Sequence, residues 1–315
     1  MQERKLKQFL IEQKSLITLL ILVALVSFLN ANFFTLDNIF NILQQTSINA
    51  IIAVGMTLVI LTSGIDLTVG SLFAFPGAIA ASVIGLEMSP FLAILAALTL
   101  GGILGACSGI IIAKGKLQPF IATLVMMLIL RGATMVYTKG SPISLGMSDS
   151  ADFFEWVGFG RVLMIPTPIW IMGFVFLGAW YLLKYTRLGR YIYALGGNEA
   201  ATRLSGINVD RVKIAVYTIS GVLCALASII EISRLSSAQP NAGVGYEMDA
   251  LAAVVLGGTS MAGGRGKVIG TLIGALILGL LNNGLNLLGV DPYFQMIVKG
   301  AVILLAVLVD NVTHK

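Results

Sequence analysis

The sequence predicts an all-α polytopic membrane protein with about ten transmembrane helices, forming a single domain over residues 1–315. Hydrophobic residues make up 57% of the 315 residues and charged residues only 11%, whereas a soluble domain carries about 25% charged residues. The apolar runs are continuous rather than alternating, which favours helices over the strands of a transmembrane barrel. The 35 glycines suit helices that pack closely in lipid.

Five spans are expected in the first half of the chain. Apolar runs place them at about 16–29, 46–62, 67–86, 91–113 and 119–138, each ended by charged or polar residues. The third span is shorter and contains Pro76. A basic segment precedes the first span, and no small-residue cleavage site follows it. We therefore expect a retained helix after a cytoplasmic segment at 1–15.

Five further spans are expected after a long polar segment, at about 167–184, 212–233, 249–262, 268–288 and 293–310. The eighth is short and interrupted by glycine. Similar glycine-containing runs at 101–106 and 270–275 begin apolar runs within the fourth and ninth spans. Because these spans are five apart, the similarity suggests two inverted five-helix repeats, a pattern typical of transporters. The alternative is that glycine-rich helices resemble one another by composition alone.

Basic residues indicate the orientation of the spans. With the N-terminus in the cytoplasm, most of the 20 Lys and Arg residues fall in cytoplasmic connections, among them Lys114, Lys116, Arg265 and Lys267. This bias is the one that membrane insertion imposes, and it predicts that both termini are cytoplasmic. It also accounts for the net charge of +5 without any nucleic-acid partner.

The segment 184–213 is the longest predicted cytoplasmic connection. Asn198 is a suitable N-cap, Glu199 follows in the first turn, and Gly206 is a natural stop, so we expect one short helix here. Its small apolar face comprises Ala200, Ala201 and Leu204. Such a helix either docks in a groove of another protein or lies on lipid headgroups, and the pattern does not separate the two.

Ionisable residues within membrane spans are candidate functional groups. Lys299 is the deepest, and we expect it to reach toward the interface or bind a carbonyl rather than relay protons. Asp66 is expected to be the N-cap of the third span. Glu231 and Arg234, three apart on one helix face, are expected to pair. Two acidic residues before the eighth span are expected to be caps: Glu247 and Asp249.

The sequence predicts no catalytic or metal site. Its only histidine is His314, and its two cysteines, Cys107 and Cys224, lie in apolar runs where we expect no disulfide. The run 263–268 resembles a P-loop, but it lacks the first glycine and the hydroxyl residue that would bind Mg²⁺. We expect a tight cytoplasmic turn there, so any ATP hydrolysis must come from another chain.

The segment 188–209, LGRYIYALGGNEAATRLSGINV, resembles the coupling loop of permeases from bacterial sugar ABC importers. The resemblance covers nearly the whole chain and is strong over 41–71, 116–138, 234–264 and 270–290, while 143–165 and the first dozen residues match less well. Within this family, the resemblance is greatest to permeases for ribose, so the expected role is translocation of a monosaccharide, ribose above all, across the bacterial inner membrane.

The resemblance also implies partners. Two permease copies would form the pathway, a periplasmic sugar-binding protein would deliver the sugar, and a cytoplasmic ATPase would hold the ATP and Mg²⁺, so that this chain binds no cofactor. Membrane lipid would surround the spans. The residues implied to dock on the ATPase are Gly197, Asn198, Glu199, Ala200, Ala201, Thr202, Arg203, Leu204, Ser205, Gly206 and Ile207.

A neutral sugar would pass best along amides, hydroxyls and small residues. The candidates for its pathway are Asn49, Thr57, Thr62, Asn282, Asn283 and Asn286. These side chains are equally suited to bonding between neighbouring helices. The pathway is expected to bind sugar weakly, because the resemblance places specificity in the separate binding protein.

Two other classes of function would require features of their own. A secondary transporter driven by an ion gradient would need a titratable group in the pathway, and Lys299 or Asp66 would have to serve. An intramembrane enzyme would need a catalytic constellation within the spans, which the single His314 and the lack of paired membrane carboxylates argue against.

Overall fold

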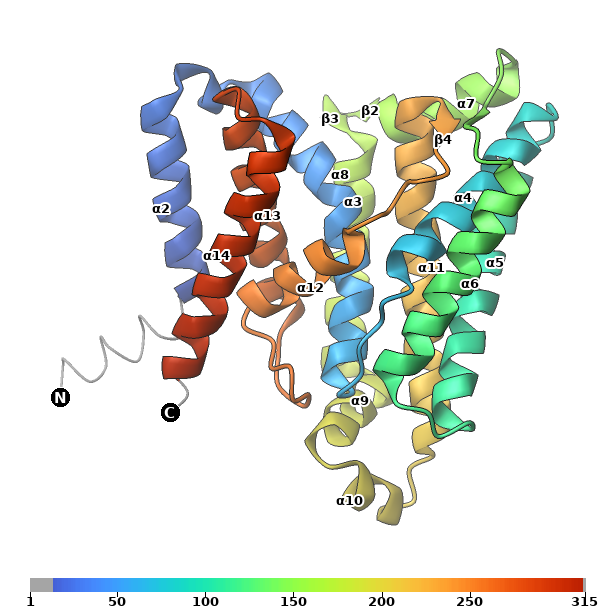
Figure 1. Cartoon of the computed structure of the whole chain (residues 1–315), viewed down its shortest axis with the longest axis vertical. Helices are drawn as coiled ribbons and strands as arrows, with labels where there is room; N and C mark the ends of the chain where they lie inside the picture. Colours follow the sequence, from blue (N-terminus) through green and yellow to red (C-terminus); the bar gives the residue numbers. More distant parts are fainter. Residues whose placement is uncertain (1–13, 314–315) are drawn as a thin grey trace.

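The structure is a computed structural model that describes residues 14–313 (Figure 1). His314 and most of the predicted N-terminal segment lie outside the described residues. In chain order, the helices of the first half are α2 (Lys14–Leu29), the 3-10 helix η1 (Ala31–Phe34), α3 (Leu36–Leu61), α4 (Val69–Gly85), α5 (Pro90–Ala113), α6 (Pro119–Thr138) and α7 (Asp149–Phe159). Those of the second half are α8 (Thr167–Tyr185), α9 (Arg187–Gly197), α10 (Glu199–Leu204), α11 (Val209–Leu235), α12 (Tyr246–Leu256), α13 (Val268–Leu287) and α14 (Pro292–Thr313).

Six helices of the described part are long and apolar enough to cross a membrane: α3, α5, α6, α8, α11 and α13. Shorter apolar helices lie at Leu16–Phe28, Val69–Gly85 and Pro292–Leu304. The polytopic all-α class is therefore confirmed. The helix predicted at 249–262 is instead α12, with 11 residues, because Gly257 and Gly258 end it and Gly258 adopts φ +81°.

The second predicted span also differs from the structure. It was expected to begin at about residue 46, whereas α3 begins at Leu36, directly after the N-cap Thr35. The polar residues of its first turns suggest a loop, but Asn38 is buried and exchanges hydrogen bonds with Asn283 of α13, at 2.9 and 3.1 Å. A partner distant in sequence thus satisfies groups that look solvent-exposed in the sequence.

Close packing of α5 on α11 forms the centre of one half of the bundle. A Cβ added at Gly101 would lie 2.5 Å from the carbonyl oxygen of Gly221, and one at Gly105 would lie 2.3 Å from that of Tyr217. Only glycine allows the two backbones to approach so closely. Helix α3, most of whose residues from Thr46 onward are buried, packs on α11 and also contacts α8, α12 and α13.

The packing partners repeat in the two halves of the chain. Helix α5 packs against α4 and α11, while α13 packs against α12 and α3. Helices α3 and α11 pack against one another between these groups. In both halves, a short helix, α4 or α12, thus lies beside a longer glycine-containing one.

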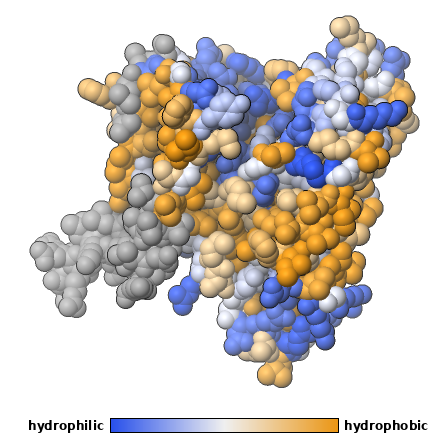
Figure 2. Space-filling model, in the orientation of Figure 1, coloured by the Kyte–Doolittle hydropathy of each residue, from blue (hydrophilic) through white to orange (hydrophobic). Residues whose placement is uncertain are grey.

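The two ends of the bundle differ in structure. Helices α9 and α10 project at one end, and α7 lies at the opposite end (Figure 1). Near α7, β1 (Ile143–Ser144) pairs with β4 (Ser237–Ala238), and β2 (Arg161–Val162) pairs with β3 (Ile165–Pro166). Hydrophobic side chains gather over the middle of the face in Figure 2, and hydrophilic ones gather at the α9–α10 end and in a hollow in the opposite half.

Candidate functional site

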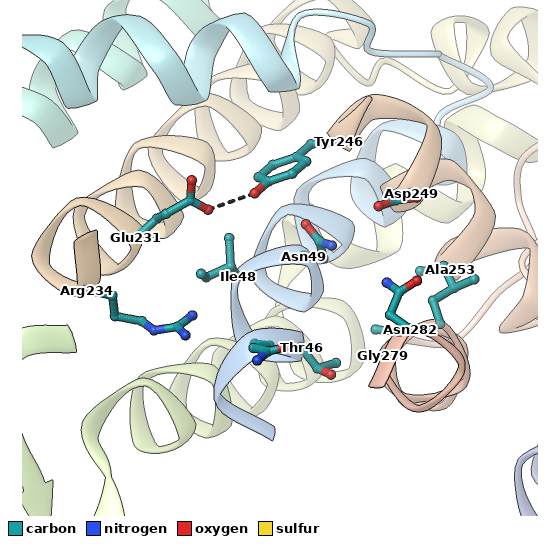
Figure 3. A pocket seen from close by; sticks show the side chains of 13 residues that line it. Thr46, Ile48, Asn49, Glu231, Arg234, Tyr246, Asp249, Ala253, Gly279 and Asn282 are labelled. Atoms are coloured by element: carbon teal, nitrogen blue, oxygen red, sulfur yellow. Dashed lines mark hydrogen bonds between the residues drawn. The ribbon is translucent and has the colours of Figure 1, made fainter. Parts of the chain in front are cut away.

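A cavity of about 220 Å³ lies among α3, α11, α12 and α13 (Figure 3). It lies in the half of the bundle away from α9 and α10, because it is lined by the first half of α3 and the last turns of α11. Its lining residues are Gln45, Thr46, Ile48, Asn49, Glu231, Arg234, Tyr246, Asp249, Ala253, Ala275, Leu278, Gly279 and Asn282. Amide, hydroxyl, carboxylate, guanidinium and aromatic groups therefore surround one small space.

Three buried polar atoms of this cavity lack a hydrogen-bond partner among the described residues: Thr46 Oγ1, Asn49 Oδ1 and Asn282 Oδ1. An unsatisfied buried polar group costs about 1–3 kcal/mol, so the cavity is suited to a guest that can hydrogen-bond. Gly279 brings α13 close to α3 here, since a Cβ at that position would lie 1.9 Å from Thr46 Oγ1.

Charged and aromatic groups line the opposite side of the cavity. Tyr246 donates a hydrogen bond of 2.8 Å to the Glu231 carboxylate (Figure 3). The expected pairing of Glu231 with Arg234 is thus replaced by a bond to α12, while Arg234 lines the cavity separately. These groups supply both hydrogen-bond donors and acceptors around one space, so the cavity can bind a small solute with several hydroxyls.

Two of the six predicted pathway residues, Asn49 and Asn282, line this cavity together. The structure does not bring the other four to it. Thr57 lies 2.7 Å from Thr271 Oγ1, and Thr62 donates to the Val59 carbonyl at 2.7 Å.

Two asparagines of α13 make bonds to other helices. Asn283 exchanges hydrogen bonds with Asn38 of α3, and Asn286 accepts one of 2.7 Å from Gln295 of α14. All four side chains outside the cavity thus have bonds within or between helices, the alternative that the sequence left open.

Sequence reasoning did not place Thr46, Glu231, Arg234, Tyr246 and Asp249 in a pathway. The available signal was the cluster of ionisable residues near the end of the seventh span and the start of the eighth, which are rare in membrane helices. The residues of α11 and α12 come together because the chain turns back between these helices, and Thr46 joins them through the packing of α3. No spacing within one helix reveals either arrangement.

The expectations for Lys299 and the acidic residues near α12 were wrong. Lys299 forms an ion pair with Asp249, 3.3 Å from Nζ to Oδ2, which links α14 to α12. Glu247 and Asp249 lie inside the first turn of α12, whose N-cap is Gly245. Carboxylates in that turn are favoured by the positive end of the helix dipole, although neither side chain caps the helix.

Asp66 is fully buried and is not the N-cap of α4, which is Thr68. Its carboxylate accepts hydrogen bonds from the Thr68 backbone N–H at 3.0 Å, from the Thr68 hydroxyl, and from Ser220 of α11 at 2.9 Å. Nearby, Tyr217 donates to the Ile65 carbonyl at 3.1 Å. The turn before α4 is thereby attached to α11, so a structural role accounts for this carboxylate.

A second candidate site is the α9–α10 end of the molecule. Residues 184–213 contain the predicted short helix, α10, and the Asn198 side chain accepts a hydrogen bond of 2.9 Å from Ala201 N–H, as expected of an N-cap. Gly206 adopts φ +81° after the helix. The amphipathic helix α9 in the same segment was not predicted.

Ion pairs attach α10 to the start of α11. Glu199 lies 3.2 Å from Arg203 and 2.8 Å from Lys213, and Arg203 lies 3.3 Å from Asp210. Partial burial raises the pKa of the Glu199 carboxyl, but the bonds from Lys213 and Arg203 outweigh it, and the pKa lies below its ordinary value. Leu204 is 90% exposed, so the network presents an apolar side chain to the exterior.

The predicted tight turn at 263–267 joins this end to α3 and α9. Gly263 and Gly264 have φ of +86° and +69°, and Gly264 N–H donates to the Leu61 carbonyl at 3.0 Å. Ser63 donates to the Ala262 carbonyl at 2.8 Å. Ser63 also donates to the Gly196 carbonyl of α9 at 3.3 Å. Three separate segments, the end of α3, the end of α9 and this turn, therefore meet here.

Comparison with known proteins places the chain among transport permeases. The family model described as branched-chain amino acid transport system / permease component matches residues 38–307. The ribose import permease protein of Escherichia coli strain K12 is 70% identical over 97% of this chain and 95% of its own length. No solved structure matches.

More distant relatives carry other names. The ribose import permease protein of Bacillus subtilis strain 168 is 53% identical over 93% of this chain and 90% of its own length. The D-allose transport system permease protein of Escherichia coli strain K12 is 39% identical over 94% of this chain and 90% of its own length.

Proposed function

The chain belongs to the branched-chain amino acid transport system / permease component family, and from this premise we propose that it imports ribose as the membrane-spanning permease subunit of an ATP-binding-cassette importer. It is a non-catalytic, multi-pass protein of the bacterial inner membrane, and a partner subunit hydrolyses ATP. The observation that carries the proposal is 70% identity to a ribose import permease over 97% of the chain.

The choice of ribose rests on how identity varies among the relatives. Relatives named for ribose are 70% and 53% identical, whereas the relative named for D-allose is 39% identical. The cavity is consistent with a small sugar, because its volume of about 220 Å³ is below the roughly 300–1,000 Å³ of pockets for drug-sized ligands.

We propose that the sugar passes through the cavity bounded by α3, α11, α12 and α13. Asn49 and Asn282 offer unpaired acceptors to its hydroxyls, and Tyr246 and Glu231 face them from the other side (Figure 3). Thr57, Thr62, Asn283 and Asn286 stabilise helix contacts in this arrangement. Weak binding is expected, because a separate periplasmic protein supplies specificity.

Residues 197–207 form the proposed docking surface for the ATPase. Support comes from the exposed Leu204 at the end of α10 and from the ion pairs that attach α10 to α11. Burial of an exposed leucine in an apolar groove of the partner stabilises the complex.

The wider architecture is also part of the proposal. Nine apolar helices of the described part together with the short α12 make ten membrane-embedded segments in one domain, and the repeated packing partners of α5 and α13 favour two inverted halves. Both termini are cytoplasmic on the basic-residue argument. Two copies, surrounded by lipid, complete the pathway.

Reconstitution tests the function directly. The permease, its ATPase and its sugar-binding protein are placed in vesicles, and entry of labelled ribose is followed with and without ATP. Entry should require ATP and the binding protein, and unlabelled ribose should compete better than xylose or allose. Entry that persists without ATP and collapses with an ion gradient would contradict the proposal and favour a secondary transporter.

A further inference from the structure

A second cavity lies at the α9–α10 end, among the ends of α8 and α9 and the start of α13. Its volume is about 360 Å³, and it is lined by Trp180, Leu183, Lys184, Tyr193, Lys267, Val268 and Ile269. It is separate from the transport cavity, with which it shares no lining residue. Apolar side chains make most of its wall, and two lysines provide its charge.

The chemistry of this cavity combines an apolar wall with cationic groups. Lys184 and Lys267 are exposed, and the Lys184 ammonium lies 5.0 Å from the Trp180 ring centroid and 5.2 Å from that of Tyr185. These cation–π contacts hold the ammonium at the rim. No acidic side chain lines the cavity, so its positive charge is left for an anionic guest.

The position of the cavity matches the membrane interface. Trp180 and Lys184 lie near the end of α8 that adjoins α9, and tryptophan, tyrosine and lysine are the side chains that membrane proteins place at headgroup level. Ile269, in the first turn of α13, is 57% exposed beside the lysines. An apolar exposed residue next to cationic ones suits a molecule with both an acyl chain and an anionic head.

We propose that this cavity binds the headgroup of an anionic phospholipid, with the phosphate on Lys184 and Lys267 and the first part of an acyl chain against Leu183 and Ile269. Basic pockets between membrane helices on the cytoplasmic side recognise anionic lipids by this combination. A second copy of the chain is a poorer occupant, because a two-fold interface here would bring the same lysines toward one another.

Occupation of the cavity bears on the coupling segment. Tyr193 lines the cavity and donates a hydrogen bond of 2.9 Å to the Gly266 carbonyl, in the turn before α13. The guest therefore contacts α9, which leads directly into α10. Loss of the lipid is expected to loosen α9 and so to lower ATPase coupling, independently of which sugar is carried.

Fluorescence quenching tests the proposal on the full chain. The chain has three tryptophans, and the double substitution W156F/W170F leaves Trp180 as the only one. The protein is placed in phosphatidylcholine vesicles containing either brominated phosphatidylglycerol or the same fraction of brominated phosphatidylcholine. The anionic lipid should quench Trp180 at least about threefold more strongly per mole fraction, because the two lysines attract an anionic headgroup.

Matched variants separate a site from general charge attraction. The double substitution K184Q/K267Q should abolish the preference, whereas K114Q/K116Q, at another turn of the same end, should retain it. A protein with Trp170 as its only tryptophan, at the opposite end of α8, should show no preference. Equal quenching of Trp180 by both lipids, or a preference that survives K184Q/K267Q, would refute the proposal.

The remaining outcomes identify other occupants and also overturn the proposal. Release of quenching by inorganic phosphate at millimolar levels would assign the cavity to free phosphate rather than to lipid. Absence of quenching by either lipid would show that protein covers Trp180, as a second copy would. In both cases ribose uptake can still depend on ATP, so failure here is distinguishable from failure of the proposed function.

Discussion

The substitution Leu204→Ala separates docking of the ATPase from stability of the permease. Leu204 is 90% exposed at the end of α10, so its truncation removes almost no buried area from the permease itself. A surface substitution of this kind changes the free energy of unfolding by less than about 0.5 kcal/mol. Full burial of a leucine in a partner's groove, by contrast, is worth about 1.5–3 kcal/mol.

The expected effect of Leu204→Ala is therefore confined to the complex. Most of that burial energy would be lost, and a loss of about 1.4 kcal/mol weakens association tenfold. We expect the dissociation constant of the ATPase to rise about tenfold and sugar-stimulated ATP hydrolysis to fall, while the melting temperature of the permease alone stays unchanged. All three are measured on protein purified in detergent.

A matched control exists at the opposite end of the molecule. Leu163, in the turn between β2 and β3, is 81% exposed, and Leu163→Ala removes the same atoms. This control should bind the ATPase as the parent protein does. Docking by α10 is refuted if Leu204→Ala and Leu163→Ala give the same dissociation constant and the same coupled ATPase activity.

Three further predictions concern packing, the pathway and pH. Gly105→Leu should destabilise the permease by more than about 3 kcal/mol in thermal melts, or prevent folding, because a Cβ at this position would lie 2.3 Å from the Tyr217 carbonyl oxygen. Gly178→Ala is the control, because open space surrounds that position. Equal melting temperatures for the two variants would contradict the close packing of α5 and α11. Asn282→Leu should lower ribose uptake at least several-fold while leaving ATP hydrolysis intact, and unchanged uptake would remove the cavity from the pathway. Because the pKa of Glu199 is lowered in the folded protein, its ion pairs stabilise α10 fully at a pH above the ordinary pKa of 4.5. This stabilisation is lost as the pH falls through the folded-state pKa. Amide exchange of α10 should therefore speed up relative to that of α11 in acid, and Glu199→Gln should remove this pH dependence.

Local signals in the sequence were sufficient for part of the fold. The N-cap at Asn198, the stop at Gly206 and the turn at 263–267 follow from single residues with strong conformational preferences, and the structure contains all three. The class of the fold follows from hydrophobic runs too long for anything but membrane helices. These predictions succeeded because each depends on neighbours in the sequence.

The misses depend on contacts between distant residues. The first turns of α3 look like a loop until Asn283 supplies the partner of Asn38. Lys299 looked unpaired because Asp249 is 50 positions away and meets it only through the packing of α12 against α14. Among the amides predicted to line the pathway, Asn282 faces the cavity while others bond neighbouring helices. The sequence does not distinguish them, because the difference lies in their partners in three dimensions.

Helix α11 connects the two candidate sites. Its first turns hold Asp210 and Lys213, the partners of α10, and its last turns place Glu231 in the cavity. The 18 residues from Lys213 to Glu231 span about 27 Å at 1.5 Å per residue, which is most of the bilayer core. Glycine contacts fix the middle of α11 against α5.

We infer that a push on α10 moves α11 and α5 as one body and displaces Glu231 relative to Tyr246 on α12, so a docking event at one end can open the cavity near the other. Spin labels on α5 and α11 should keep their separation between nucleotide states while labels on α11 and α12 change theirs, and a change between α5 and α11 would refute this rigid coupling.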